Sequence, residues 1–233
     1  MRFDGRDYNE IRDTEMKIGV ISKADGSAYC RTGNTIAIAA VYLKPGREQS
    51  NLKVSYRMLP FAGEERKGLG LTRREIELSY IIAKALEPAI IFEEIPYLTI
   101  EASVEIIKAD AGTRVAAINA LSLALAHAGI PMKALVGAIA VGKVGEKIVL
   151  DLNKQEEDYD SEIIKKELPQ YYEYYGEGKA VDIPMAMYKN KITLLQLDGS
   201  IDRKSLLEAI KLGKDGIKRM IDLQKIAIED YYF

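Results

Sequence analysis

Residues 109–114, Ala-Asp-Ala-Gly-Thr-Arg, stand between a segment with strand character and one with helix character. The preceding residues, Tyr97–Ile107, have the composition and alternation of a strand. The following residues, Thr113–His127, are apolar on almost every side, which is typical of a buried helix, and Gly129 and Pro131 end that helix. This stretch therefore predicts a fold in which a sheet leads directly into a covering helix.

The same stretch is a candidate anion site. Gly112 and Thr113 come at the start of the buried helix, where free backbone N–H groups and the helix dipole favour negative charge. Arg114 adds a planar guanidinium fork that suits phosphate. The alternative is a purely structural role, with Thr113 as an N-cap and Arg114 paired with Asp110.

Further strands and helices are expected on both sides of this stretch. Thr72 and Glu75 fit a capping box that opens a helix, and Pro88 closes it. Gly and charged residues at 61–71 indicate an exposed loop. The other expected strands are Met16–Ser22, Thr35–Tyr42, Leu52–Met58, Leu135–Val141, Lys147–Leu152, Val181–Tyr188 and Ile192–Leu197; a short helix is expected near Ser161–Leu168 and a long one from Asp202 to about Asp230.

This order of sheet then helix, followed by sheet then helix, predicts an α+β fold. We expect one domain over residues 1–233, with two packed halves at roughly 1–130 and 131–233.

Composition excludes several classes of protein. The chain has 233 residues, of which 48% are hydrophobic and 29% charged, and it contains no apolar run long enough to span a membrane. A single cysteine, Cys30, excludes an internal disulfide, and a single histidine, His127, excludes a His-based metal site. Charged residues at the N-terminus argue against a signal peptide, so a cytoplasmic location is expected.

Charge is unevenly distributed, although the net charge is only −2. Residues 53–74 hold six basic side chains against two acidic ones, and residues 146–182 hold eleven acidic against five basic ones. The two segments could meet to bind a polyanion beside a divalent metal ion, or they could form two separate solvated faces.

Four basic residues are candidates for binding a nucleic-acid backbone. Arg73 and Arg74 lie in the first turn of a helix, where cations oppose the helix dipole unless a ligand or a carboxylate such as Glu77 compensates them. Lys53 and Arg57, four residues apart on a strand, share one face.

Acidic residues are candidates for metal binding or proton transfer. A cluster follows the strand that ends near Leu152, and Asp182 begins the next strand. Paired carboxylates from adjacent strands suit a hydrated Mg²⁺ ion or a general acid. Other catalytic signatures are absent from the sequence, including a Walker A motif, a Gly-x-Gly-x-x-Gly motif and a Cys pair.

Taken together, these segments resemble the RNase PH family, and within it the catalytic ring subunits of the archaeal exosome. The resemblance covers nearly the whole chain, in family order. The matching pieces are Asp4-Gly5-Arg6, Ala24–Ala28, Gly33-Asn34-Thr35, Met58–Phe61, Glu65-Arg66-Lys67, Thr72–Leu78, Ala109–Arg114, Ala128–Met132, Leu150–Asn153 and Asp182–Ala186.

The resemblance implies an RNase PH-like (ribosomal protein S5 domain 2-like) fold and a phosphorolytic 3′→5′ exoribonuclease. Inorganic phosphate, as co-substrate, would attack the last phosphodiester of RNA and release a nucleoside diphosphate. Gly112, Thr113 and Arg114 would bind that phosphate. Arg73 and Arg74 would contact RNA, with Arg57 and Lys53 as further contacts. Asp182 would be one of two carboxylates that bind a metal ion, expected to be Mg²⁺, or protonate the leaving oxygen.

The second carboxylate falls in a departure from the family pattern. An acidic, tyrosine-rich insertion lengthens the segment before Asp182. The candidates are Asp158, Glu157 and Glu173, and Asp158 is chosen as the catalytic and metal-binding partner of Asp182.

The resemblance also implies partners. These are RNA, a homologous inactive ring subunit that completes a heterohexamer, and RNA-binding cap subunits, with no membrane. Two alternatives stay open: a catalytically impaired RNA-binding ring scaffold, and a homohexameric RNase PH that trims tRNA.

Overall fold

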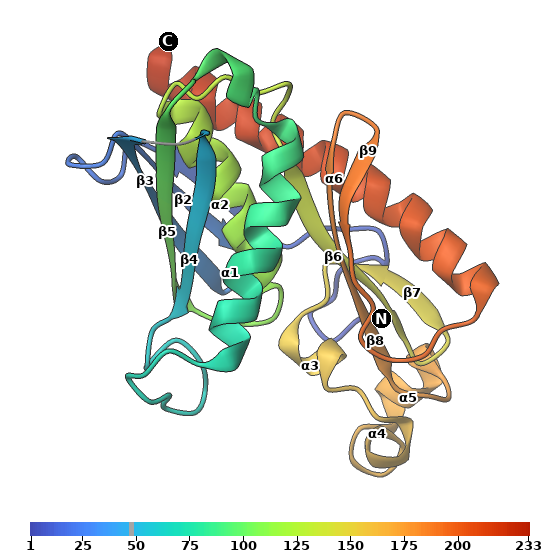
Figure 1. The fold of residues 1–233 in the computed structure, drawn as a ribbon. Helices are drawn as coiled ribbons and strands as arrows, with labels where there is room; N and C mark the ends of the chain where they lie inside the picture. Colours follow the sequence, from blue (N-terminus) through green and yellow to red (C-terminus); the bar gives the residue numbers. More distant parts are fainter. Residues whose placement is uncertain (47–48) are drawn as a thin grey trace.

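The computed structural model describes residues 1–46 and 49–233 as two sheets with helices between and beside them (Figure 1). The first sheet has the strand order β1-β2-β3-β5-β4, in which neighbours are antiparallel except for the parallel pair β4 and β5. Its strands are β1 (Thr14–Ile18), β2 (Gly26–Thr32), β3 (Thr35–Pro45), β4 (Asn51–Met58) and β5 (Leu98–Lys108).

The second sheet is antiparallel, with the order β7-β6-β8-β9. Its strands are β6 (Gly137–Val144), β7 (Lys147–Leu150), β8 (Ala180–Tyr188) and β9 (Lys191–Leu195). The helices are α1 (Arg73–Leu86), α2 (Thr113–His127), α3 (Lys154–Glu157), α4 (Ser161–Glu167), α5 (Pro169–Tyr175) and α6 (Arg203–Tyr232), with 3₁₀ turns at Glu87–Ala89 and Phe92–Glu94.

Helix α2 forms the centre of the molecule because it packs on both sheets. It contacts β2 and β3 of the first sheet and β6 of the second, and every residue from Val115 to Leu125 is buried. The close approach to β2 requires Gly26, since a Cβ atom there would come within 2.2 Å of the Ala124 carbonyl oxygen. The all-round apolar character of the sequence is explained by these two contact surfaces.

A buried polar group joins α2 to α6 and β6. The Asn119 amide donates to the Ala138 carbonyl at 2.8 Å and accepts from the Ala138 N–H at 2.9 Å. The Gln224 amide on α6 donates to Asn119 Oδ1 at 3.0 Å and to the Val136 carbonyl at 2.9 Å. These bonds fix how the two sheets sit relative to α2, because buried polar groups cost stability unless they are paired.

The predicted α+β class is confirmed, and several local predictions hold. The Thr72–Glu75 capping box is present, and Asp202 caps the long final helix. The strand expected at Met16–Ser22 is shorter, because β1 ends at Ile18, before Gly19, which has φ +73°. Strand β2 and helices α3 and α5 had no clear signal in the sequence. In the part of the chain that the structure describes, no helix combines the length and apolarity that a membrane span requires.

Candidate active site

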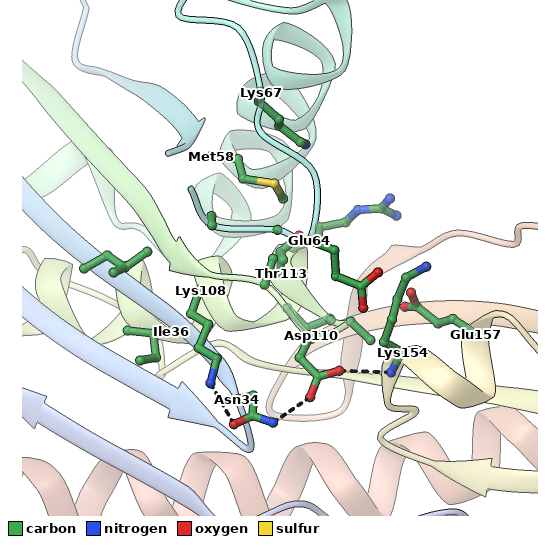
Figure 2. Close-up of a pocket in the computed structure, with 18 of the residues that line it drawn as sticks. Asn34, Ile36, Met58, Glu64, Lys67, Lys108, Asp110, Thr113, Lys154 and Glu157 are labelled. Atoms are coloured by element: carbon green, nitrogen blue, oxygen red, sulfur yellow. Dashed lines mark hydrogen bonds between the residues drawn. The ribbon is translucent and has the colours of Figure 1, made fainter. Parts of the chain in front are cut away.

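A cleft of about 1100 Å³ lies where the two sheets meet at the N-terminal end of α2 (Figure 2). The end of β5, the first turn of α2 and the loop 61–67 form its first wall, and α3 and β8 form the second. The loop is tied to the end of β5, because the Ala109 N–H donates to the Ala62 carbonyl at 2.7 Å. The cleft is therefore built on a buried helix and on two sheets.

The backbone at Ala111 and Gly112 forms an open cradle at the start of α2. Both residues have positive φ, 60° and 66°, and Gly112 is the N-cap without a side-chain capping bond. The Thr35 hydroxyl holds the turn by donating to the Ala111 carbonyl at 2.6 Å and accepting from the Asp110 N–H at 2.9 Å. The first N–H groups of α2 have no partner within the helix and lie at the end that lines the cleft, where an anion is favoured.

Thr113 and Arg114 add side-chain donors to this cradle. The buried Tyr56 hydroxyl donates to Thr113 Oγ1 at 3.0 Å, so the Thr113 proton stays available to another acceptor. Arg114 Nη1 donates to Gln196 Oε1, while its Nε is buried and has no partner among the described residues. Burial lowers the pKa of Arg114 against the attraction of Asp182. An unpaired buried N–H of this kind is costly unless a ligand accepts from it.

Asp182, at the start of β8, faces the cleft from the second sheet. Its Oδ1 is buried without a partner among the described residues. Burial raises the pKa of Asp182 to about 6, with Arg114 acting in the opposite direction and Asp198 adding to the rise. The predicted site residues Gly112, Thr113, Arg114 and Asp182 therefore line one cleft.

Glu157, the last residue of α3, supplies the second carboxylate of the cleft (Figure 2). Burial and the negative charge of Asp182 raise the pKa of Glu157 to about 7, while Lys154 and a hydrogen bond from the Gly112 backbone lower it. A carboxyl group whose pKa is raised by burial and by a neighbouring negative charge keeps its proton in part of the molecules near neutral pH.

The structure does not place Asp158, the predicted partner of Asp182, in the lining of the cleft. Asp158 is exposed, forms an ion pair with Lys154 at 2.5 Å, and lines a smaller neighbouring cavity instead of the cleft. Glu173 is exposed on α5 and also lies outside the cleft lining. Asp158 is the C-cap of α3, and its side chain points in another direction than that of Glu157, the last residue of the helix.

The Asp110 carboxylate connects the two walls of the cleft (Figure 2). It accepts from the Asn34 amide at 3.1 Å and from the Lys154 backbone N–H at 3.2 Å, and Lys108 donates to Asn34 at 3.0 Å. Asp110 does not pair with Arg114, which was the structural alternative for this stretch. The hydrogen bonds of Asp110 hold the N-terminus of α3 close to the backbone cradle at Ala111 and Gly112.

Only one of the four predicted RNA-binding residues lines the cleft. Arg74 lines the cleft, whereas Arg73, next to it on α1, is exposed outside the lining. Neither arginine forms an ion pair with a residue that the structure describes, so Glu64, Glu65 and Glu77 do not neutralise them.

Lys53 and Arg57 lie outside the cleft lining, on the exposed face of the edge strand β4. Their register neighbours on β5 are Glu101 and Glu105.

Sequence reasoning did not assign four other residues of this region. Arg66 and Lys67 in the exposed loop line the cleft, although they had no predicted role beyond the basic segment and the family resemblance. Tyr56 and Gln196 contact Thr113 and Arg114 from distant strands or loops. No local signal marks the last two, because Tyr56 on β4 and Gln196 just after β9 are far from Thr113 and Arg114 in the sequence and only the tertiary fold brings them near.

Comparison with known proteins identifies the family of this chain. The models of the "3′ exoribonuclease family", domain 1 and domain 2, match residues 10–131 and 134–216. The "Exosome complex component Rrp41" of Pyrococcus furiosus is 44% identical over 241 residues, covering 99% of this chain and 89% of that protein. The protein with the same description from Methanopyrus kandleri is 42% identical, covering 100% and 93%.

Among solved structures, the crystal structure of rice Rrp46 superposes with a TM-score of 0.78 at 24% identity, covering 96% of this chain and 98% of that one. At this identity the likeness concerns the fold alone.

Proposed function

This chain belongs to the 3′ exoribonuclease (RNase PH) family, and from that premise we infer that it is the phosphorolytic 3′→5′ exoribonuclease subunit of an exosome. In this reaction an oxygen of inorganic phosphate attacks the last phosphorus atom of an RNA chain. The bond between that phosphorus and the 3′ oxygen of the preceding nucleotide breaks. The terminal nucleotide leaves as a nucleoside diphosphate, and the shortened RNA keeps a 3′ hydroxyl.

A single observation carries the assignment of the reaction to the cleft. Its lining residues on both walls keep polar groups without partners among the described residues: Arg114 Nε and the N-terminal end of α2, which has no side-chain cap, on one wall, and Asp182 Oδ1 on the other. We propose that Gly112, Thr113 and Arg114 bind the attacking phosphate. Positioning and electrostatic stabilisation are the main contributions that a protein makes to such a transfer.

The leaving 3′ oxygen needs a proton, and Glu157 is our candidate donor. A carboxyl group with a pKa of about 7 keeps its proton in a useful fraction of molecules near neutral pH. We propose Glu157 and Asp182 as the catalytic carboxyl pair, with Glu157 in the role first given to Asp158.

When both carboxyl groups are ionised, the same two residues would instead fit the ligand set of Mg²⁺, which is commonly held by one or two carboxylates together with substrate phosphates and water. The described residues contain no group of three or more His, Cys, Asp or Glu side chains arranged for a metal ion, which argues against a cage made by protein alone. Asp182 Oδ1, buried without a partner, is a suitable ligand atom. When bound, Mg²⁺ supplies positive charge that stabilises the developing negative charge.

RNA is proposed to enter along the basic side of the cleft. Arg74, Arg66 and Lys67 line it, and basic side chains bind the phosphate backbone without sequence preference. Arg73, Lys53 and Arg57 are exposed outside the cleft lining, and we keep these three as proposed outer contacts.

The relatives' description as exosome components supports assembly into a ring of several subunits. We propose a heterohexamer with a homologous inactive subunit, cap subunits that bind RNA, and a cytoplasmic location. No observation favours the impaired scaffold or the homohexameric tRNA-trimming enzyme over this reading, because the lengthened acidic segment still carries a carboxylate, Glu157, that lines the cleft.

The test is a product analysis. The purified chain, alone and with its ring partner, is incubated with 3′-labelled RNA, Mg²⁺ and either phosphate or a phosphate-free buffer. We expect labelled nucleoside diphosphates only when phosphate is present. Nucleoside monophosphates would indicate hydrolysis, and no release under any condition would overturn the catalytic proposal in favour of the scaffold.

A further inference from the structure

The lengthened segment 154–180 folds back on itself so that its end contacts its beginning. It forms the three short helices α3, α4 and α5 at one end of the second sheet (Figure 1). Tyr175, the last residue of α5, is fully buried and packs with Phe3 at a ring distance of 5.5 Å and with Tyr159 at 5.2 Å. The hydroxyl of Tyr175 donates to Glu156 Oε1 on α3 at 2.6 Å.

Glu156 anchors α3 in the interior of the protein through hydrogen bonds. Its carboxylate is fully buried and accepts from Arg2 Nε at 2.7 Å, from Arg2 Nη2 at 2.6 Å and from the Asn153 N–H at 3.1 Å, in addition to Tyr175. The Asn153 side chain closes the capping box by accepting from the Glu156 N–H at 2.9 Å. Both carboxylate oxygens are thus satisfied by two partners each, as a buried charge requires.

The orientation of Glu157 depends on the hydrogen bonds that hold Glu156. Helix α3 has only four residues, too few to be stable without tertiary contacts. Glu157 follows Glu156 directly and points about 100° away around the helix axis. With Glu156 held in the interior, Glu157 faces the cleft and Asp182, while Asp158 faces solvent.

We propose that Tyr175, acting through Glu156, is a positioning residue that holds the carboxyl group of Glu157 in the cleft. The inference rests on the proposed function for its catalytic consequence, but the ordering of α3 can be measured independently of catalysis. The lengthened segment would then support catalysis. The alternative of an impaired scaffold, in contrast, would associate this segment with a loss of activity.

The experiment removes one hydroxyl group. Tyr175→Phe keeps the buried ring and its contacts with Phe3 and Tyr159, and it leaves Glu156 paired with Arg2. Two variants serve as matched controls. Tyr172→Phe removes a hydroxyl on the same helix that donates to another glutamate, Glu177, at 2.6 Å, and Tyr159→Phe removes a buried one that donates to the Gly176 carbonyl at 2.6 Å.

Three quantities are measured on the chain assembled with its ring partner: kcat, the KM values for RNA and phosphate, and hydrogen exchange at the amides of residues 156–158. We expect Tyr175→Phe to lower kcat by about 5- to 50-fold with both KM values within about twofold, since small misplacements of a catalytic group reduce the rate strongly. Exchange at these amides should accelerate by about tenfold. Both controls should stay within about twofold of wild type.

The outcomes separate the two proposals. An unchanged kcat and unchanged exchange in Tyr175→Phe would overturn the positioning role while leaving the exonuclease assignment intact. Equal losses in all three variants would also overturn it, because they would indicate general packing of the insertion. A wild-type chain without activity would overturn the proposed function, and the exchange measurement alone would then decide whether Tyr175 orders α3.

Discussion

Arg114 and Asp182 face the same cleft and attract one another, but they do not form a salt bridge. The positive charge of Arg114 lowers the pKa of Asp182. The two side chains are nevertheless not among the ion pairs of the described residues, in which a nitrogen and an oxygen lie within 4.0 Å. Each keeps one buried polar atom without a partner, Nε and Oδ1. Because both side chains line the cleft and keep unpaired polar atoms, they indicate where single substitutions will act.

Asp182→Asn should remove activity and spare RNA binding. The substitution preserves shape but removes the negative charge and the capacity to exchange a proton, so we expect kcat to fall by at least ~100-fold, the usual scale of acid–base and metal-ligand contributions. Asp198→Asn, an exposed neighbour paired through its backbone with Asp182, is the control and should retain activity. Turnover of the Asp182 variant within tenfold of wild type would contradict the assignment.

Glu157→Gln and Asp158→Asn test which carboxylate completes the site. We expect the first to lower kcat by at least ~100-fold and the second to change it less than about threefold, because only Glu157 lines the cleft. Steady-state kinetics with saturating RNA and phosphate measure both. The reverse order of effects would restore Asp158 as the catalytic residue and show that α3 rotates when substrate binds.

Arg114→Lys should raise the KM for phosphate by about tenfold. Lysine keeps the positive charge but loses the planar fork that bonds phosphate at two points, a difference worth about 1.4 kcal/mol. The control is Arg219→Lys on α6, whose guanidinium donates to the Asn9 carbonyl at 2.8 Å, outside the lining of the cleft. A change in the KM for RNA with no change for phosphate would move Arg114 from the phosphate site to the RNA site.

Glu157→Gln should stabilise the protein at alkaline pH in metal-free buffer. The folded-state pKa of about 7 lies above the ordinary value of 4.5, so the folded state binds more protons than the unfolded state between these values. Wild-type stability therefore falls as pH rises from about 4.5 to 7, and the neutral glutamine avoids this loss. After discounting for partial exposure, we expect a gain of about 1–2 kcal/mol at pH 8 and little at pH 4.

Urea unfolding of both proteins at pH 4, 6 and 8 with a chelator measures this difference. Asp182→Asn should show the same sign, because burial also raises the pKa of Asp182, from 3.8 to about 6. A variant less stable than wild type at pH 8 would show that the carboxylate forms favourable contacts in the folded state.

Arg74→Ala should weaken RNA binding more than Arg73→Ala. Arg74 lines the cleft and Arg73 does not, so only the first should remove a phosphate contact. We expect about a five- to tenfold loss of affinity for Arg74→Ala, and a salt dependence reduced by about 0.7 in the log–log slope, as for one contact to a single strand. Fluorescence anisotropy over a range of salt concentrations gives both values. Equal effects would indicate that RNA crosses the outer face of α1.

The part of this protein that the sequence determines is local. The capping box at Thr72 and Glu75 and the cradle at Gly112 depend on neighbouring residues, and the structure has both. Strands β6 and β7 overlap the predicted strands Leu135–Val141 and Lys147–Leu152, and they pair through a tight turn between Val144 and Lys147. Backbone conformation and hydrogen bonds over a few residues decide such features, so they were predictable without knowledge of the rest of the chain.

Only the tertiary structure decided which acidic and basic side chains meet. Glu157 and Asp158 are equivalent in the sequence, and the choice between them depends on the rotation of α3 about its axis. That rotation is set by Glu156, which binds Arg2 from the far end of the chain. The packing of α1 likewise places Arg74, but not Arg73, in the lining of the cleft. A cleft lined from both sheets is assembled by long-range packing, and the distance between residues along the chain carries no information about it.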